Sequence, residues 1–188
     1  MRTNFPKLKA IVAATAAAAA LSLPGQGLAQ GLSADVLLQD LAMAEASEAA
    51  AIDRELQALW AKSGSPSMDL LLRRGTDAME RGDLQQAAEH LTALTDHAPE
   101  FARGWYERAR VYFALGLYGP SVADLERALA LNPKDYNAIY ALGALFEQFR
   151  EPERAYQAYQ RAKAIHPHHE EVSSALERLK LSVEGREL

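Results

Sequence analysis

The amino-acid sequence predicts an all-α fold, an α-solenoid built from stacked helical hairpins. Three prolines, Pro99, Pro133 and Pro167, lie 34 residues apart, and each one closes a stretch with helical periodicity. Between these prolines, small and large apolar residues recur at matching offsets. A fixed period of this length is typical of repeat architectures, in which each unit is stable only when it stacks on its neighbours.

The composition excludes several classes of chemistry. The chain has 188 residues, of which 49% are hydrophobic and 24% charged, the balance of an ordinary soluble globular protein. It has no cysteine, which excludes disulfides, thiol catalysis, thiolate metal sites and the acylated cysteine of a lipoprotein. The formal net charge is -5. Because an acidic surface repels phosphate backbones and anionic lipids, we expect neither nucleic-acid binding nor charge-driven membrane binding.

Residues 1–29 have the layout of a secretory signal peptide. Three cations precede an Ala-rich apolar run over residues 10–23, and small residues stand at Gly27 and Ala29. This order predicts export and cleavage after Ala29. The alternative is a retained membrane anchor, but a run of this length forms a helix of only about 21 Å, shorter than the roughly 30 Å hydrocarbon layer. We therefore expect a soluble protein of the bacterial periplasm, without stable membrane insertion.

Residues 30–67 predict a helical lead-in to the repeats. Ser33 can cap a first helix, and an amphipathic helix follows after an Ala- and Glu-rich stretch in which a break is expected. Its apolar stripe needs a partner, and we expect it to dock on the first repeat; the alternative is a separate helix that mediates self-association. Ser65 is placed to cap the next helix, with Pro66 at its first position. The stripe consists of Ile52, Leu56, Leu59 and Trp60.

Three copies of one unit occupy residues 68–169, with boundaries at 68–101, 102–135 and 136–169. Positions 8 and 20 of each unit are small, which lets the two helices of a hairpin cross at short distance. Turns stand between the helices at the same offset, with glycines that permit positive φ and prolines that start the second helix. Position 8 is Gly75, Ala109 and Gly143; position 20 is Ala87, Ser121 and Ala155; the turn residues are Gly82, Gly116, Pro120 and Pro152.

This pattern resembles the tetratricopeptide repeat (TPR). The third copy carries the resemblance most fully, and the second copy adds two large aromatic residues at family positions. The first copy departs from the family at Arg74, and Ser121 replaces a small alanine in the second. The resemblance covers residues 68–169. The residues that carry it are Leu142, Gly143, Phe146, Ala155, Tyr159, Ala162 and Pro167, with Trp105 and Tyr112 one unit earlier.

Residues 170–188 predict one more amphipathic helix. Its apolar positions are spaced to cover the last repeat, and its other face is charged. Such a helix is typical of the end of a solenoid, which needs a polar outer face. The apolar positions are Val172, Leu176, Leu179 and Val183.

The histidines are the residues that could bind a metal. His166, His168 and His169 cluster beside Glu170, and histidine is the commonest transition-metal ligand. They lie in the turn around Pro167, and no carboxylate pair with ligand spacing completes a site, so a solvated loop is the expectation and metal binding the less favoured alternative. No nucleophile stands with a partnered base, and no Gly-rich phosphate loop is present. We expect no enzymatic activity and no cofactor.

The family resemblance implies where binding occurs. In the family, the first helices line a concave groove, and ligand contacts come from recurrent positions on them. Arg103 and Arg110 lie on one helix face with Tyr106 between them, which suits an extended peptide with an acidic group and an apolar side chain. The alternative for Tyr106 and Phe113 is packing between adjacent repeats. The implied groove residues are Leu72, Thr76, Met79, Arg103, Tyr106, Arg110, Phe113, Asn137, Tyr140 and Glu147.

One branch of the family is not expected. Some chaperone adaptors clamp a terminal carboxylate with lysine and asparagine, but Leu72, Thr76, Tyr140 and Ala144 stand at such positions. A chaperone tail is therefore not the expected partner.

The leading functional hypothesis is a non-enzymatic periplasmic scaffold. It would bind a peptide or partner protein in the groove, within an envelope or secretion assembly. The alternative is a homo-oligomeric structural spacer assembled through the lead-in helix. A third hypothesis is a metal binder acting through the His166–His169 loop.

Overall fold

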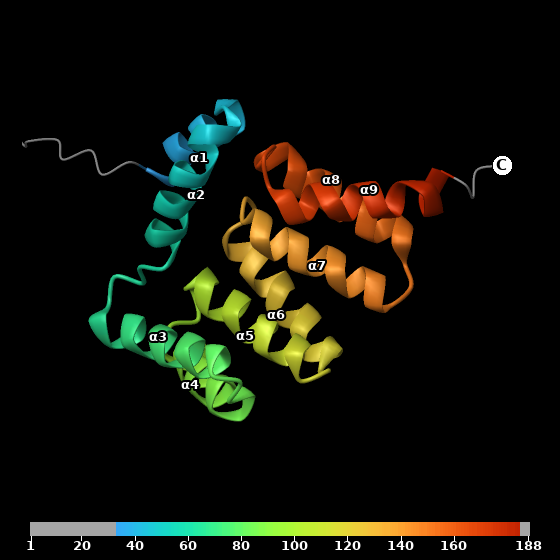
Figure 1. Ribbon diagram of the computed structural model, residues 1–188. Helices are drawn as coiled ribbons and strands as arrows, with labels where there is room; N and C mark the ends of the chain where they lie inside the picture. Colours follow the sequence, from blue (N-terminus) through green and yellow to red (C-terminus); the bar gives the residue numbers. More distant parts are fainter. Residues whose placement is uncertain (1–32, 185–188) are drawn as a thin grey trace, which may run out of the picture. The chain divides into compact units, whose positions relative to one another are not determined.

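The structure is a computed structural model that describes residues 33–184 (Figure 1). The predicted signal peptide and its cleavage site lie outside these residues. Within them the chain forms nine helices and no strand, which confirms the predicted all-α class. No helix in this range is both long and apolar enough to cross a membrane. The helices are α1 (Ala34–Met43), α2 (Ala46–Trp60), α3 (Pro66–Glu80), α4 (Leu84–His97), α5 (Ala102–Ala114), α6 (Tyr118–Leu131), α7 (Tyr136–Gln148), α8 (Pro152–Ile165) and α9 (Glu170–Glu184).

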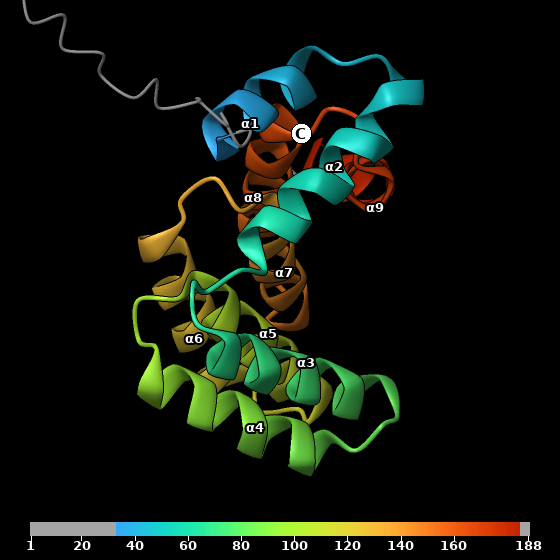
Figure 2. The same ribbon diagram turned by 90° about the vertical axis from the view of Figure 1, so that its left-hand side faces the viewer.

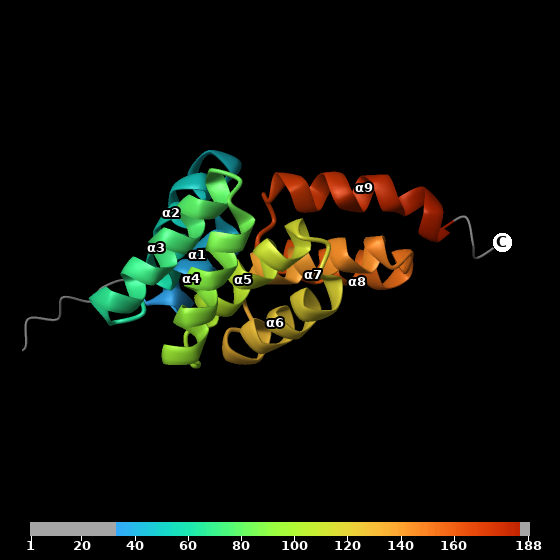
Figure 3. The ribbon, with the colours of Figure 1, turned by 90° about the horizontal axis from the view of Figure 1, so that it is seen from below.

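Helices α3 to α8 pair as consecutive hairpins. Helix α3 packs on α4, α5 on α6, and α7 on α8, and each hairpin also contacts the next through α4 with α5 and α6 with α7. Figure 3 shows these pairs following one another, with α9 beside α7 and α8. We refer to α3–α4, α5–α6 and α7–α8 as the first, second and third hairpins.

The predicted close crossings are present in the first and third hairpins. A Cβ atom on Gly75 would lie 2.5 Å from Leu91 Cγ, and one on Gly143 would lie 2.5 Å from Tyr159 Cε1. Both distances are far inside van der Waals contact, so only glycine fits between these helices. In the second hairpin, Ser121 Oγ donates to the Ala109 carbonyl oxygen at 2.8 Å, which explains why a hydroxyl is tolerated at that buried position.

Local chemistry sets the hairpin turns. Gly82 and Gly116 have φ of 78° and 74°, as their position in the turns predicts. The third turn has no glycine, and Arg150 takes the left-handed conformation instead, with φ of 60°. Ser65 was expected to cap α3 through its side chain but makes no such hydrogen bond. Asp69 Oδ1 instead accepts from the Ser63 amide at 2.8 Å and holds the turn from inside the helix.

A buried ion pair within the second hairpin is linked to the first hairpin by a hydrogen bond. Arg108 Nε and Nη2 donate to the two carboxylate oxygens of Asp124 at 2.7 and 2.9 Å, and Arg108 Nη1 donates to Thr95 Oγ1 at 2.7 Å. The guanidinium also lies 4.9 Å from the centroid of the Trp105 ring. This network connects α4, α5 and α6, and the hydrogen bond with Asp124 is the main reason why the pKa of Arg108 is raised. No pattern in the sequence indicates this network.

The lead-in helices α1 and α2 pack on the third hairpin, whereas docking on the first was predicted. Leu41 and Leu56 are fully buried in a cluster with Ile139, Tyr159 and Val172. Helix α1 contacts α8, and Figure 2 shows residues 61–65 leading away from α2 to α3. The break between α1 and α2 falls at residues 44–45, inside the Ala- and Glu-rich stretch where it was expected.

The reason for this placement is a polar and aromatic seat at the start of α7. The Trp60 ring lies 5.6 Å from the Tyr136 ring. Gln57 Nε2 donates to the Tyr136 hydroxyl at 2.8 Å, and that hydroxyl donates to Asp53. Burial, followed by this bond to Asp53, raises the pKa of Tyr136. The apolar stripe of the lead-in thus packs within the same chain.

Helix α9 packs against α8. Val172, Ala175 and Leu179 are buried in the same cluster as the lead-in and the third hairpin. Glu147 of α7 ties α9 down through an ion pair with Arg178, whose Nη2 donates to Oε1 at 3.0 Å. The end of the hairpin stack is therefore closed by apolar burial and one charged clamp.

Candidate functional site: a cavity between α5 and α7

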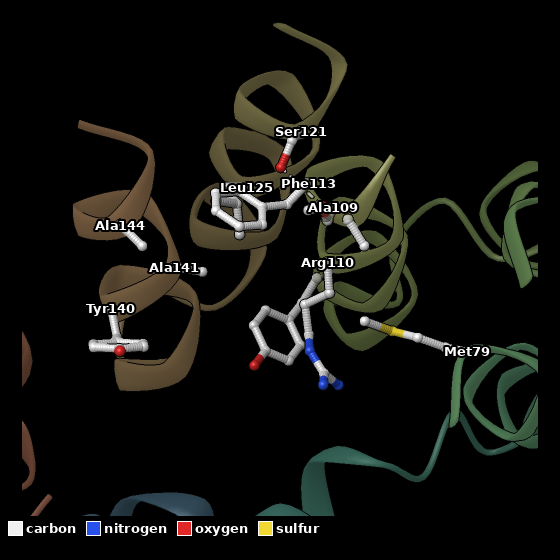
Figure 4. Close-up of a pocket in the computed structure, with 11 residues that line it drawn as sticks. Met79, Ala109, Arg110, Phe113, Ser121, Leu125, Tyr140, Ala141 and Ala144 are labelled. Atoms are coloured by element: carbon white, nitrogen blue, oxygen red, sulfur yellow. Dashed lines mark hydrogen bonds between the residues drawn. The ribbon is translucent and has the colours of Figure 1, made fainter. Parts of the chain in front are cut away.

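A cavity of about 320 Å³ opens between the first helices of the second and third hairpins. Figure 4 shows Ala109, Arg110 and Met79 on one side of it and Tyr140 and Ala144 on the other. Its volume lies at the lower end of the range for ligand pockets, which start at roughly 300 Å³. The lining is mainly apolar and consists of Met79, Tyr106, Ala109, Arg110, Phe113, Ala114, Ser121, Leu125, Tyr140, Ala141 and Ala144.

Small side chains create the hollow. Ala109 and Ala141 face it from α5 and α7, and Ala144 continues the α7 wall one turn further. Phe113 closes one end and is held by Tyr118, with ring centroids 5.5 Å apart. A cavity with aromatic walls and a small-residue floor can accept an apolar side chain from a partner.

The positive charge beside the cavity is partly neutralised. Glu107 is buried on α5 and pairs with both flanking arginines, with Arg103 Nε at 2.8 Å and Arg110 Nη1 at 2.6 Å. The Arg103 side chain is only 17% exposed, and its Nη1 also donates to Gln57 Oε1 at 2.6 Å. The Arg110 side chain is 42% exposed. One guanidinium therefore remains open to a ligand, where the sequence suggested two.

Tyr106 lies between the two arginines. The Arg103 guanidinium lies 5.0 Å from the Tyr106 ring centroid and the Arg110 guanidinium 5.8 Å from it. Burial raises the pKa of the Tyr106 phenol, so this group is neutral at physiological pH and acts only as a hydrogen-bonding and apolar surface.

Five of the ten predicted groove residues line this cavity, namely Met79, Tyr106, Arg110, Phe113 and Tyr140. The other five lie elsewhere, for separate reasons. Leu72 is 6% exposed and belongs to the core of the first hairpin. Glu147 is engaged by Arg178 and by the Tyr159 hydroxyl, which donates to it at 2.6 Å.

Thr76, Arg103 and Asn137 do not line the cavity either. Thr76 Oγ1 donates to the carbonyl oxygen of Arg73 within its own helix. Arg103 is held by α2, as described above, and Asn137 Oδ1 lies 3.2 Å from His169 Nε2. The floor residues Ala109, Ala141 and Leu125 were not predicted as site residues. The signal that could have found them is the small residue at position 8 of the second copy together with the alanines of α7.

Comparison with known proteins supports the same description of the repeats. The model of the tetratricopeptide repeat matches residues 72–119 and 121–170, slightly more than half of the chain. The chain belongs to the tetratricopeptide-repeat family. A TPR repeat-containing protein of Rhizobium etli is 27% identical over 120 residues, which cover 64% of this chain and 59% of that protein. A bovine SGT1 homolog is 36% identical over 73 residues, which cover 39% of this chain and 22% of that protein. The matches thus span less than two thirds of these relatives.

Solved TPR domains have the same fold. The Sgt2 TPR domain of Aspergillus fumigatus is similar with a TM-score of 0.61 and 25% identity, covering 65% of this chain and 83% of that one. The first TPR of Spaghetti (RPAP3), solved with an HSP90 peptide, gives a TM-score of 0.60 and 23% identity, covering 62% and 93%. TPR domains of this kind typically mediate peptide or protein binding and are generally not catalytic, although an O-GlcNAc transferase is also among the similar structures.

The turn after the third TPR hairpin differs from the solvated loop that was predicted. His166 is 6% exposed, and its ring lies 5.0 Å from that of Tyr136 in an edge-on arrangement. His169 packs against Tyr140 with ring centroids 5.6 Å apart. Among residues 33–184, no group of three or more histidine or acidic side chains has the geometry to hold a metal ion. His166 is buried and His169 is half-buried because the lead-in helices, whose position the sequence did not predict, cover this turn, whereas His168 stays exposed.

Proposed function

We propose that this TPR protein is a non-enzymatic scaffold that binds a peptide segment of a partner protein in the cavity between α5 and α7. The observation that carries the proposal is the cavity itself, an aromatic and alanine-lined hollow on first helices, with one exposed guanidinium, Arg110, beside it. A bulky apolar side chain of the peptide fills the cavity, and an acidic group next to it contacts Arg110.

The finer parts of the proposal rest on the sequence. The three hairpins correspond to three TPR repeats at 68–101, 102–135 and 136–169, preceded by the lead-in at 30–67 and followed by the capping helix at 170–188. The signal-peptide layout supports export, cleavage near Ala29 and a periplasmic site of action, where the partner belongs to an envelope or secretion assembly. The HSP90 peptide bound to Spaghetti and the Hsp70 complex of a yeast Sti1 TPR domain give examples of peptide ligands in this family.

The test is to fill the cavity and measure peptide binding. Peptides selected from a random library against the wild-type protein are titrated by calorimetry into Ala144→Phe, which places a ring in the hollow. We expect affinity to fall at least tenfold, equivalent to about 1.4 kcal/mol. Ala130→Phe, on the exposed face of α6, is the matched control and should leave affinity unchanged. Equal binding to Ala144→Phe and wild type would reject the cavity as the site.

A further inference from the structure

Three histidines lie at the contact between the lead-in helices and the third hairpin. A cavity of about 230 Å³ lies between α2 and the turn that joins α8 to α9. Asp53 of α2 lines it, together with Glu170 and Glu171 at the start of α9. The remaining polar lining residues are His166, His168 and His169, which we call the histidine turn.

The rings of His166 and His169 are largely shielded from water, and His169 Nδ1 lies 3.1 Å from Glu171 Oε2, on a side chain that is 69% exposed. His166 Nδ1 is buried and has no hydrogen-bond partner. The His166 and His169 ring centroids lie 5.3 Å apart, so protonation of both would place two positive charges next to each other in a region shielded from water. His168 is exposed but contributes directly to docking, because its Nε2 donates to the carbonyl oxygen of Ala44, in the connection between α1 and α2, at 3.0 Å.

We propose that the histidine turn is a proton-controlled latch, which holds the α1–α2 hairpin on the third hairpin while His166 and His169 are neutral and releases it when they are protonated. This inference does not depend on the proposed peptide site. It concerns the contact between the lead-in and the seat formed by Tyr136 and the histidine turn.

The charged groups around the histidine turn shift the pKa of His166 and His169 in both directions, and burial is the largest cause of the net shift. Asp53 from α2 and Glu171 from α9 favour protonation, whereas Lys163 from α8 opposes it. Burial lowers the pKa of both His166 and His169 below the usual 6.5. Asp53 is already engaged by the Tyr136 hydroxyl and by Gln57 Nε2, which limits what it can offer a protonated ring.

The direction of the pH effect follows from these shifts. Because the docked state holds the histidines neutral, the released state binds more protons once the pH falls below about 6.5. Docking is therefore at full strength above that pH and weakens as the pH falls further. For each unit by which docking lowers a histidine pKa, acid raises the released population by up to about tenfold.

Release would also change the concave side of the TPR hairpins. Gln57 accepts from Arg103 at 2.6 Å, and this is the contact that joins α2 to the arginine pair on α5. When α2 leaves, Arg103 loses Gln57, keeps its ion pair with Glu107 and its contact with the Tyr106 ring, and becomes more accessible. Acid would thus expose a second guanidinium next to Tyr106.

The experiment is hydrogen exchange of the full chain, analysed by mass spectrometry at pH 7.5 and pH 5.0 and corrected for intrinsic exchange rates. The readout is the opening equilibrium of the α2 amides, with the α4 amides as an internal reference for general acid destabilisation. We expect opening of α2 to rise at least tenfold at pH 5.0 relative to α4. An equal response of α2 and α4 would overturn the latch.

Substitutions assign the effect to the histidines. His169→Gln and His166→Gln keep a neutral polar side chain at these positions, and each should remove part of the extra opening of α2 in acid. Because His166 is the C-cap residue of α8 and its substitution could disturb folding, His169→Gln provides an independent test. His97→Gln, at the exposed end of α4, is the matched control and should retain the full response. A full response in both His166→Gln and His169→Gln would also overturn the proposal.

Discussion

At the scale of single residues, the hairpin crossings depend on the absence of one atom. Gly143 lies against Tyr159, whose ring is fixed by burial and by its hydroxyl bond to Glu147. Gly143→Ala gains about 1 kcal/mol of helix propensity but forces a methyl group to within 2.5 Å of a ring carbon, an overpacking cost of roughly 1–3 kcal/mol. We expect net destabilisation of up to about 2 kcal/mol in urea unfolding.

A second glycine provides the comparison. A Cβ atom on Gly104 would lie 3.2 Å from Leu94 Cγ and Cδ2, a distance that a small movement relieves. Gly104→Ala should therefore be neutral within about 0.5 kcal/mol, since propensity offsets the contact. If both variants had the same stability, close approach would not be the reason for glycine at position 143.

The buried ion pair between Arg108 and Asp124 leads to a further prediction about single residues. Asp124→Ala leaves the guanidinium of Arg108, whose side chain is 12% exposed, without its carboxylate, and we expect a loss of about 3–5 kcal/mol in urea unfolding. Glu100→Ala removes a chemically similar carboxylate from Arg127 at the surface, where the two side chains are 77% and 41% exposed. That control should cost less than about 1 kcal/mol. Comparable losses would show that the Arg108 network adds nothing beyond a surface pair.

At the scale of elements, α9 is attached to α7 by the ion pair between Arg178 and Glu147, and this pairing shifts the pKa of the Glu147 carboxyl group. The hydrogen bond from Arg178 is the main cause that lowers the pKa of Glu147 below 4.5, and the Tyr159 hydroxyl adds to it. The stabilisation is therefore complete above about pH 4.5 and is lost as the pH falls through the lower pKa of the folded state. Glu147→Gln should reduce the acid-induced fall in Tm below pH 5.

The matched control is Glu126→Gln on the exposed face of α6. It should keep the wild-type dependence of Tm on pH. If Glu147→Gln showed the wild-type fall in Tm below pH 5, the ion pair between Glu147 and Arg178 would contribute no stability through its charge.

The elements also show what the sequence could and could not predict. The hairpins follow from periodicity, because the small residues and turn glycines that define them act on neighbours within one unit. The seat of α2 does not follow, because it depends on Gln57, Asp53 and Tyr136, which meet only after the chain has stacked. The cavity could be predicted in part. Its aromatic residues follow from their positions within the repeat unit, whereas its alanine floor lies between two hairpins and does not follow from the sequence of any single unit.

At the scale of the whole molecule, the lead-in makes the described chain depart from a linear solenoid. In a simple repeat array each element is coupled only to its sequence neighbours. Helices α1 and α2 precede α3 in sequence, yet their buried residues belong to the cluster formed by the third hairpin and α9. A substitution in the lead-in should therefore destabilise the third hairpin, at the other end of the hairpin series, more than the first.

Leu56→Ala tests this coupling, because Leu56 is fully buried in that cluster. We expect the amides of α8 to lose about 2–4 kcal/mol of protection in native-state hydrogen exchange, and those of α4 to lose less. Met43→Ala, at a side chain 78% exposed on α1, should change neither helix. A loss of protection in α8 with little loss in α4 requires a direct link through the buried cluster. A loss confined to α3 and α4 would instead mean that the coupling follows the order of the helices in the sequence.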